Sequence, residues 1–171
     1  MIKLLGATLI ILSTSWVGFE FARSLAARPK QIRDLRSSLQ ILESEIMYGH
    51  APLMEAVQKL AKQIPNPVSA LYTLFADKLR IAEVTVSKAW NESIHETRDK
   101  MELQDKELEI LYQFGETLGQ HDRQSQQKHI QLAMTHLERE ELLALEKQNK
   151  YDKMVKSLGF FTGLLIAILL M

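Results

Sequence analysis

The 171-residue chain is predicted to be all-α, a cytoplasmic helical bundle of about six helices flanked by N- and C-terminal transmembrane helices. Three observations predict this class. Apolar residues recur at helical spacing through the middle of the chain, no segment alternates like a convincing strand, and both ends are apolar runs. We therefore divide the chain into a transmembrane helix at 4–22, a helical bundle at 27–153 and a second transmembrane helix at 154–171.

The first apolar run covers residues 4–22 and would be about 28 Å long as a helix, close to the hydrocarbon thickness of a bilayer. A cleaved signal peptide is the alternative, because small residues follow the run at Ser24-Leu25-Ala26. Basic residues after the run argue against export, since positive charge stays on the cytoplasmic side. These residues are Arg23, Arg28, Lys30, Arg33 and Arg36.

The second apolar run, residues 157–171, is shorter at about 22 Å. Met154, Val155 and a Lys156 side chain that reaches the interface would lengthen it enough to span. Lysines precede it and only the carboxylate follows, so we expect both termini to face away from the cytoplasm. Within this run small residues recur every four positions and would permit close helix packing in lipid, at Gly159, Gly163 and Ala167.

The middle of the chain is predicted to contain several amphipathic helices. The first has Pro29 as an early helical residue and ends near Gly49. Its apolar stripe is Ile32, Leu35, Leu39, Leu42 and Ile46. A second helix opens at Pro52 and is stopped by Pro65-Asn66-Pro67, and further helices follow at about 68–84, 85–98 and 103–119.

The last helix is predicted to start after Asp122, a natural N-cap, and to run without interruption toward the second apolar run. Its apolar positions recur every seven residues, at Ile130, Leu137, Ala144, Tyr151 and Leu158. The other heptad position is interrupted by Glu141 and Gln148. This pattern favours packing against the bundle over a free-standing coiled coil.

Composition and spacing exclude most chemistry. Twenty-one Lys and Arg balance twenty-one Asp and Glu, so no nucleic-acid groove is indicated. The absence of cysteine excludes disulfides and thiolate sites. His129 and His136 are too far apart on one helix to share a metal ion, and the workable pairs, His136 with Glu140 and Glu92 with His95, lack further ligands. We expect no catalytic site, metal or cofactor.

The candidate contact sites for a protein partner are the irregular points of the bundle, because such positions more often serve binding than packing. They are Gly49, His50, Gly115, Gly119, Asp122 and Gln126. Gly115 and Gly119 flank the sequence GETLG, which lacks the lysine and the preceding strand of a nucleotide-binding loop. For these two glycines we favour helix termination or close helix approach.

Four segments resemble the stage III sporulation protein AB family: MIKLLGATLIILSTSWVGFEFA, EIMYGHAPLMEA, FGETLGQHDRQSQQKHI and KMVKSLGFFTGLLIAILLM. The most specific piece is FG-x-x-LG-x-x-D-x-x-x-Q, matched by Phe114, Gly115, Leu118, Gly119, Asp122 and Gln126. The stretch YGHAPLMEAVQKLAKQIPNPVSAL is also similar to the all-helical cytoplasmic domain of the type II secretion F platform protein.

The resemblance implies a mother-cell protein of the outer forespore membrane, within the channel-like assembly that keeps the engulfed forespore active. It also implies a secretion-type ATPase partner, like stage III sporulation protein AA, and other stage III membrane subunits; a homo-oligomer is compatible with this role. We expect a non-enzymatic platform that docks the ATPase. The alternatives are a membrane-tethered helical enzyme and a secreted helical adaptor.

Overall fold

The structure of the protein is a computed structural model. It describes the backbone of residues 2–48, 52–81, 84–119 and 123–170, and the side chains of these residues except 2–22, 123, 152–153 and 155–170. Six α-helices, a short 3-10 helix and no strand occur in these residues. They are α1 (Ile2–Tyr48), α2 (Leu53–Gln63), α3 (Val68–Leu79), α4 (Val86–Thr97), η1 (Arg98–Lys100), α5 (Asp105–Thr117) and α6 (Arg123–Leu170). The prediction of an all-helical bundle is confirmed.

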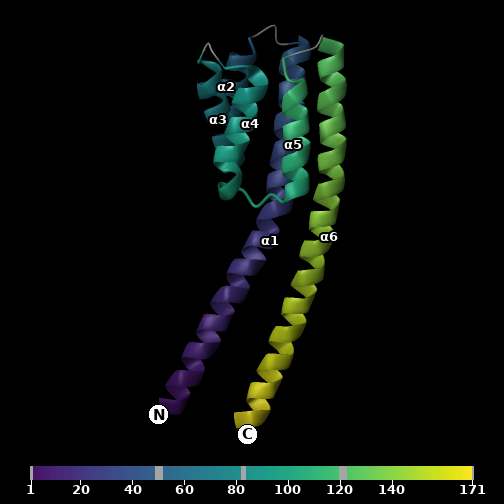
Figure 1. The fold of residues 1–171 in the computed structure, drawn as a ribbon. Coiled ribbons are helices and arrows are strands. Elements are labelled where there is room, and N and C mark those ends of the chain that lie inside the picture. Colours follow the sequence, from purple (N-terminus) through teal and green to yellow (C-terminus); the bar gives the residue numbers. More distant parts are fainter. Residues whose placement is uncertain (1, 49–51, 82–83, 120–122, 171) are drawn as a thin grey trace.

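Two long helices frame the molecule. α1 has 47 residues and α6 has 48, and both extend beyond the short helices toward the two termini (Figure 1). The prediction that the first bundle helix begins near Pro29 is wrong, because Pro29 lies inside α1 and is buried. Proline removes one helical hydrogen bond, but packing along a partner helix outweighs that local cost. α1 bends where it leaves the bundle (Figure 1), as expected for a helix that contains a proline.

The other helix boundaries follow local chemistry. Pro52 is the N-cap of α2, and the chain becomes extended at Ile64, directly before the predicted Pro65-Asn66-Pro67 stop. Thr85 caps α4 by accepting a hydrogen bond from the Lys88 amide at 3.3 Å. The Glu107 carboxylate accepts one from the Gln104 amide at 2.7 Å, at the start of α5.

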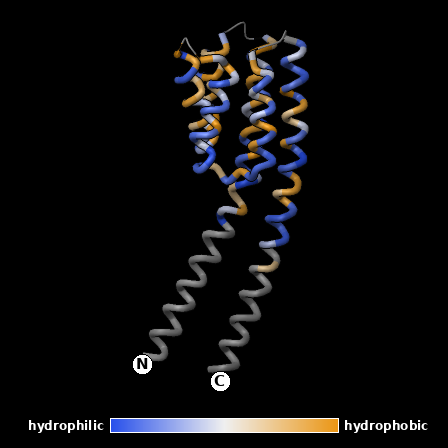
Figure 2. The backbone as a smooth tube through the Cα atoms, in the orientation of Figure 1, coloured by the Kyte–Doolittle hydropathy of each residue, from blue (hydrophilic) through white to orange (hydrophobic). Residues whose placement is uncertain are grey.

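Trp90 of α4 lies at the centre of the bundle and is 0% exposed. Its indole N–H donates to the Leu111 carbonyl oxygen at 2.7 Å. Aromatic rings from α3 and α5 surround it, with centroids 5.1 Å away for Phe75 and 5.6 Å for Phe114, both in edge-to-face geometry. Figure 2 shows polar and apolar residues mixed along each bundle helix, as amphipathic helices require.

The predicted transmembrane segments fall on residues whose side chains lie outside the described part of the chain, apart from Met154. Among the residues that the structure does describe, no helix has a stretch both long and apolar enough to cross a membrane. The predicted packing residues Gly159, Gly163 and Ala167 also lie outside the described side chains. The two spans therefore stay predictions.

Candidate functional site

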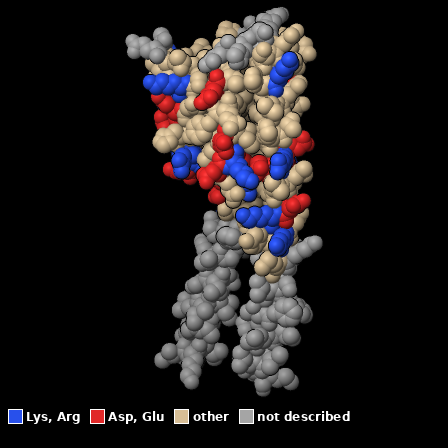
Figure 3. All heavy atoms as spheres, turned by 45° about the vertical axis from the view of Figure 1, so that its right-hand side comes forward, with Lys and Arg blue, Asp and Glu red and all other residues tan. Residues whose placement is uncertain are grey.

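A charged seam joins α1 to α6 on the side of the bundle where the two long helices run together. Glu141 of α6 is one of the two polar residues that interrupt the predicted heptad, and its side chain is only 6% exposed. It accepts hydrogen bonds from Arg33 Nε at 2.8 Å and from an Arg36 terminal nitrogen at 2.7 Å. The α6 heptad therefore faces arginines of α1 at this level. On the face drawn in Figure 3, Lys and Arg lie among Asp and Glu near the lower end of the bundle.

The environment of Glu141 sets its ionisation. Burial alone would raise the pKa of its carboxyl, but the hydrogen bonds from Arg36 and Arg33, together with their charges, outweigh burial. The pKa of Glu141 is therefore held below its ordinary value. The carboxylate stays charged at neutral pH and holds the seam closed.

A second ion pair lies deeper in the same seam. The Arg28 guanidinium donates to Glu107 of α5, whose side chain is fully buried, and lies 3.9 Å from a carboxylate oxygen of Glu140. Arg28 therefore ties α1 to both α5 and α6. Sequence reasoning did not bring these three residues together. Their positions in the sequence could have indicated burial. Arg28 precedes Ile32 by one helical turn and Glu140 follows Leu137 by almost one, so both charged residues fall on the apolar stripes of their helices.

The histidines form no metal site in the described residues, where no group of three His, Asp or Glu side chains could hold an ion. Glu92 bonds the Lys78 ammonium at 2.9 Å, and His95 beside it is exposed. His129 and His136 line a groove of about 200 Å³ between α5 and α6. The two candidate ligand pairs named from the sequence thus lie on different helices, α4 and α6, at separate sides of the bundle (Figure 1).

Gly115 is a packing residue in the interior of the bundle. It is buried, and a Cβ atom there would lie 2.1 Å from Trp90 Cδ1. Gly115 therefore allows the close approach of α4 and α5, which is one of the two roles favoured for it from the sequence. Because it is covered, it does not form part of a contact surface for a partner.

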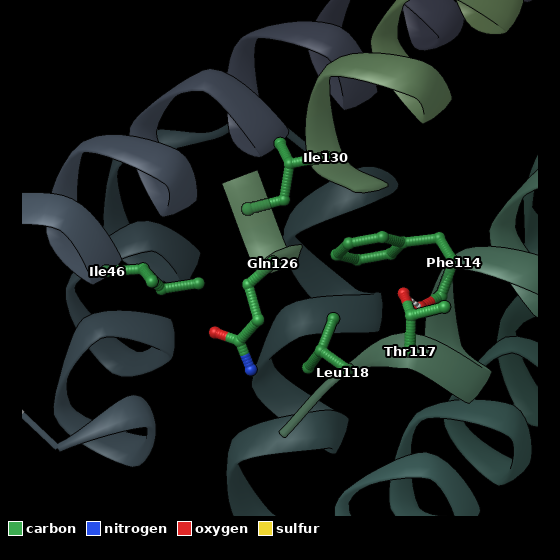
Figure 4. A pocket seen from close by; sticks show the side chains of 6 residues that line it. All are labelled: Ile46, Phe114, Thr117, Leu118, Gln126 and Ile130. Carbon is green, nitrogen blue, oxygen red and sulfur yellow. Dashed lines mark hydrogen bonds between the residues drawn. The ribbon is translucent and has the colours of Figure 1, made fainter. Parts of the chain in front are cut away.

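Gly119 ends the turn after α5 with a φ of +78°, in the left-handed region that favours glycine. Gln126 lies within two turns of the start of α6 and borders a small cavity (Figure 4). This cavity has a volume of about 10 Å³, which is too small for a ligand. The other lining residues are Ile46, Phe114, Thr117, Leu118 and Ile130. Gly49, His50 and Asp122 lie outside the described residues.

The end of the bundle farthest from the two termini holds the last residues of α1, α3 and α5 and the first residues of α2, α4 and α6 (Figure 1). Two large apolar side chains are exposed at this end, Tyr48 at 77% and Ile81 at 54%. We call the surface formed by Tyr48, Ile81, Gly119 and Gln126 the distal end. It brings the predicted contact residues Gly119 and Gln126 to the same end of the molecule as these exposed apolar groups.

Comparison with known proteins identifies the family. The family described as stage III sporulation protein AB matches residues 3–171. The chain belongs to the stage III sporulation protein AB family. It is 53% identical to stage III sporulation protein AB of Bacillus subtilis (strain 168), over 100% of both chains. A solved structure of a stage III sporulation protein AB is similar with a TM-score of 0.70 and 52% identity, covering 72% of this chain and 98% of its own.

The motif that indicated the stage III sporulation protein AB family builds the end of α5 and its connection to α6. Phe114 and Gly115 pack around Trp90, and Leu118 is buried. Gly119 supplies the left-handed turn. The described residues of this motif thus serve the fold first, and only Gly119 and Gln126 reach the distal end.

Proposed function

We propose that the protein is a non-enzymatic membrane platform of the sporulation channel-like complex. Residues 4–22 and 154–171 anchor it in the outer forespore membrane on the mother-cell side, with both termini on the far side. Its distal end docks a secretion-type ATPase like stage III sporulation protein AA, and its membrane helices meet other stage III membrane subunits. The observation that carries this proposal is that α1 and α6 leave one end of the bundle together, while the exposed apolar side chains of Tyr48 and Ile81 lie at the other end (Figure 1).

The pairing of α1 and α6 supports two anchors that enter the membrane at one level. The helices are antiparallel, and Arg33 lies opposite Glu141. Ten residues from Arg33 toward the amino terminus is Arg23, and ten from Glu141 toward the carboxyl terminus is Tyr151. These two residues therefore lie at about the same height, because both helices rise about 1.5 Å per residue. Arg23 directly follows the first predicted span at 4–22, and Tyr151 lies three residues before the second predicted span at 154–171.

The distal end suits a cytoplasmic partner for two reasons. The whole length of the bundle lies between the distal end and the proposed membrane, so a large soluble protein can reach it. It also exposes Tyr48 and Ile81, and large apolar or aromatic side chains at the centre of an interface supply most of its binding energy. The ATPase is proposed as the occupant because the family resemblance implies it.

Docking can be tested with the full-length protein in lipid nanodiscs and the purified ATPase, by measuring the dissociation constant by surface plasmon resonance. We expect Tyr48→Ser with Ile81→Ser to weaken binding at least tenfold, because each buried apolar anchor contributes about 1–2 kcal/mol. The matched control is Leu142→Ser with Leu143→Ser, which removes two exposed leucines from the side of α6. Equal binding by both double variants, or no binding by the unaltered protein at low and moderate salt, would refute the proposal.

A further inference from the structure

A polar groove lies at the opposite end of the bundle, where α1 leaves it. The groove has a volume of about 320 Å³ and is lined by α1, by the α2–α3 turn and by Lys100 and Glu102 at the end of η1 and in the loop after it, which we call the η1 loop. Its polar walls are Arg23, Ser24, Gln31, Asn66, Lys100 and Glu102. No part of the proposed ATPase contact uses this groove.

Two hydrogen bonds to side chains of α1 hold one wall of the groove, the loop after η1, against that helix. The Glu102 amide donates to Gln31 Oε1 at 2.7 Å. The Ser24 hydroxyl donates to a Glu102 carboxylate oxygen, also at 2.7 Å. The loop after η1 thus reaches down α1 as far as Ser24, two residues beyond the end of the predicted span at Ala22. With the anchors of the proposed function in place, the groove opens in the headgroup layer of the membrane, since two helical residues rise only about 3 Å.

The groove carries a surplus of positive charge. Arg23 and Lys100 are exposed, and within the described part of the chain neither has an ion-pair partner. Arg98 nearby is already paired with Asp99 at 3.4 Å. Against the two cations stands one carboxylate, Glu102, which already accepts the Ser24 hydroxyl.

The amide of Asn66 adds a neutral donor to the same wall. Its oxygen accepts the Ser69 hydroxyl at 2.7 Å, which orients the nitrogen as the remaining polar atom of the side chain. A guanidinium, an ammonium and an amide N–H₂ group are all donors, and phosphate oxygens are their natural acceptors.

We propose that this groove binds the phosphate of an anionic phospholipid headgroup, such as phosphatidylglycerol, from the cytoplasmic leaflet. Arg23 and Lys100 pair with the phosphate, and Asn66 donates a hydrogen bond to it. The bound lipid holds the base of the bundle against the membrane and so sets the height at which the distal end stands. The inference rests on the proposed function, because it requires residues 4–22 to lie in the bilayer.

The test uses the full-length protein in detergent micelles with added phosphatidylglycerol or phosphatidylcholine, and native mass spectrometry to count retained lipids. We expect preferential retention of phosphatidylglycerol and a loss of about 20- to 30-fold in apparent affinity for the double variant Arg23→Gln, Lys100→Gln, since each basic residue near a membrane surface contributes roughly fivefold. The matched control is Lys147→Gln with Lys150→Gln, which removes the same charge from exposed positions of α6 at about the same height.

Several results would overturn the inference. Equal retention of both lipids, or equal loss of phosphatidylglycerol in both double variants, would leave only general surface attraction. Displacement of the lipid by millimolar inorganic phosphate would assign the groove to a free phosphate group instead. Flotation with neutral phosphatidylcholine vesicles distinguishes the two proposals. If the protein floats but shows no preference for phosphatidylglycerol, only the lipid-binding inference is refuted. If the protein does not float, the proposed membrane anchors are refuted as well.

Discussion

Replacing Gly115 with alanine tests the packing at the centre of the bundle. The added Cβ would lie 2.1 Å from Trp90 Cδ1, far inside van der Waals contact, and 3.0 Å from Asn91 Oδ1. Trp90 is fully buried, and it cannot retreat without lengthening its hydrogen bond to the Leu111 carbonyl. Overpacking costs about 3 kcal/mol and a weakened buried hydrogen bond about 1 kcal/mol. Alanine regains about 1 kcal/mol of helix propensity, so the net loss is about 3 kcal/mol.

The assay is urea unfolding of residues 27–153, followed by circular dichroism and tryptophan fluorescence. A solved stage III sporulation protein AB structure covers a similar share of this chain, 72%. Gln113→Ala is the matched control, because Gln113 is exposed two residues earlier on α5. We expect the control to change the free energy of unfolding by less than about 0.5 kcal/mol. A Gly115→Ala variant as stable as the unaltered protein, or more stable, would refute the packing argument.

Three further predictions concern the seam and the turn. The pKa of Glu141 is lowered from 4.5, its ordinary value, so the stabilisation that its ionised carboxylate contributes is complete above pH 4.5 and is lost as the pH falls through the lower pKa of the folded state. Glu141→Gln should therefore flatten the fall in the free energy of unfolding between pH 6 and 3, whereas the control Glu146→Gln should not. Glu107→Gln should lower the free energy of unfolding, measured in urea, by about 2–3 kcal/mol, because it leaves the Arg28 charge without its buried carboxylate. The control Asp105→Asn, at an exposed position on the same turn, should have little effect. Equal effects of the two substitutions would contradict the ion-pair account. Gly119→Ala should cost about 1 kcal/mol in the same assay and Gly119→Asn less, because asparagine tolerates a positive φ better; the reverse order would refute the turn assignment.

Features encoded in local sequence were predictable. The stripe Ile32, Leu35, Leu39 and Leu42 is buried as its helical spacing indicates, and the prolines at 52 and 65 bound α2. Pro29 misled the boundary of the first helix because its local penalty is smaller than the packing of α1 along α6. That packing involves residues about a hundred positions apart, which the sequence around Pro29 does not reveal.

The seam and the groove could not be predicted for the same reason. Arg33 and Glu141 are 108 residues apart in the chain, and their pairing depends on the register of two antiparallel helices. Glu141 alone could be read only as a break in the heptad. Likewise Arg23 and Lys100 become neighbours only after the η1 loop docks on Gln31. The burial of Gly115 depends on how α4 crosses α5.

The central claim, a platform held by two membrane helices with its bundle in the cytoplasm, is tested most directly by cysteine accessibility. The chain contains no cysteine, so single residues can be labelled without background. In spheroplasts that produce the full-length protein, a membrane-impermeant maleimide should label Ile2→Cys and Met171→Cys directly. It should label Gln124→Cys, at the start of α6, only after lysis. Labelling of all three positions in intact spheroplasts, or of none until lysis, would contradict the account.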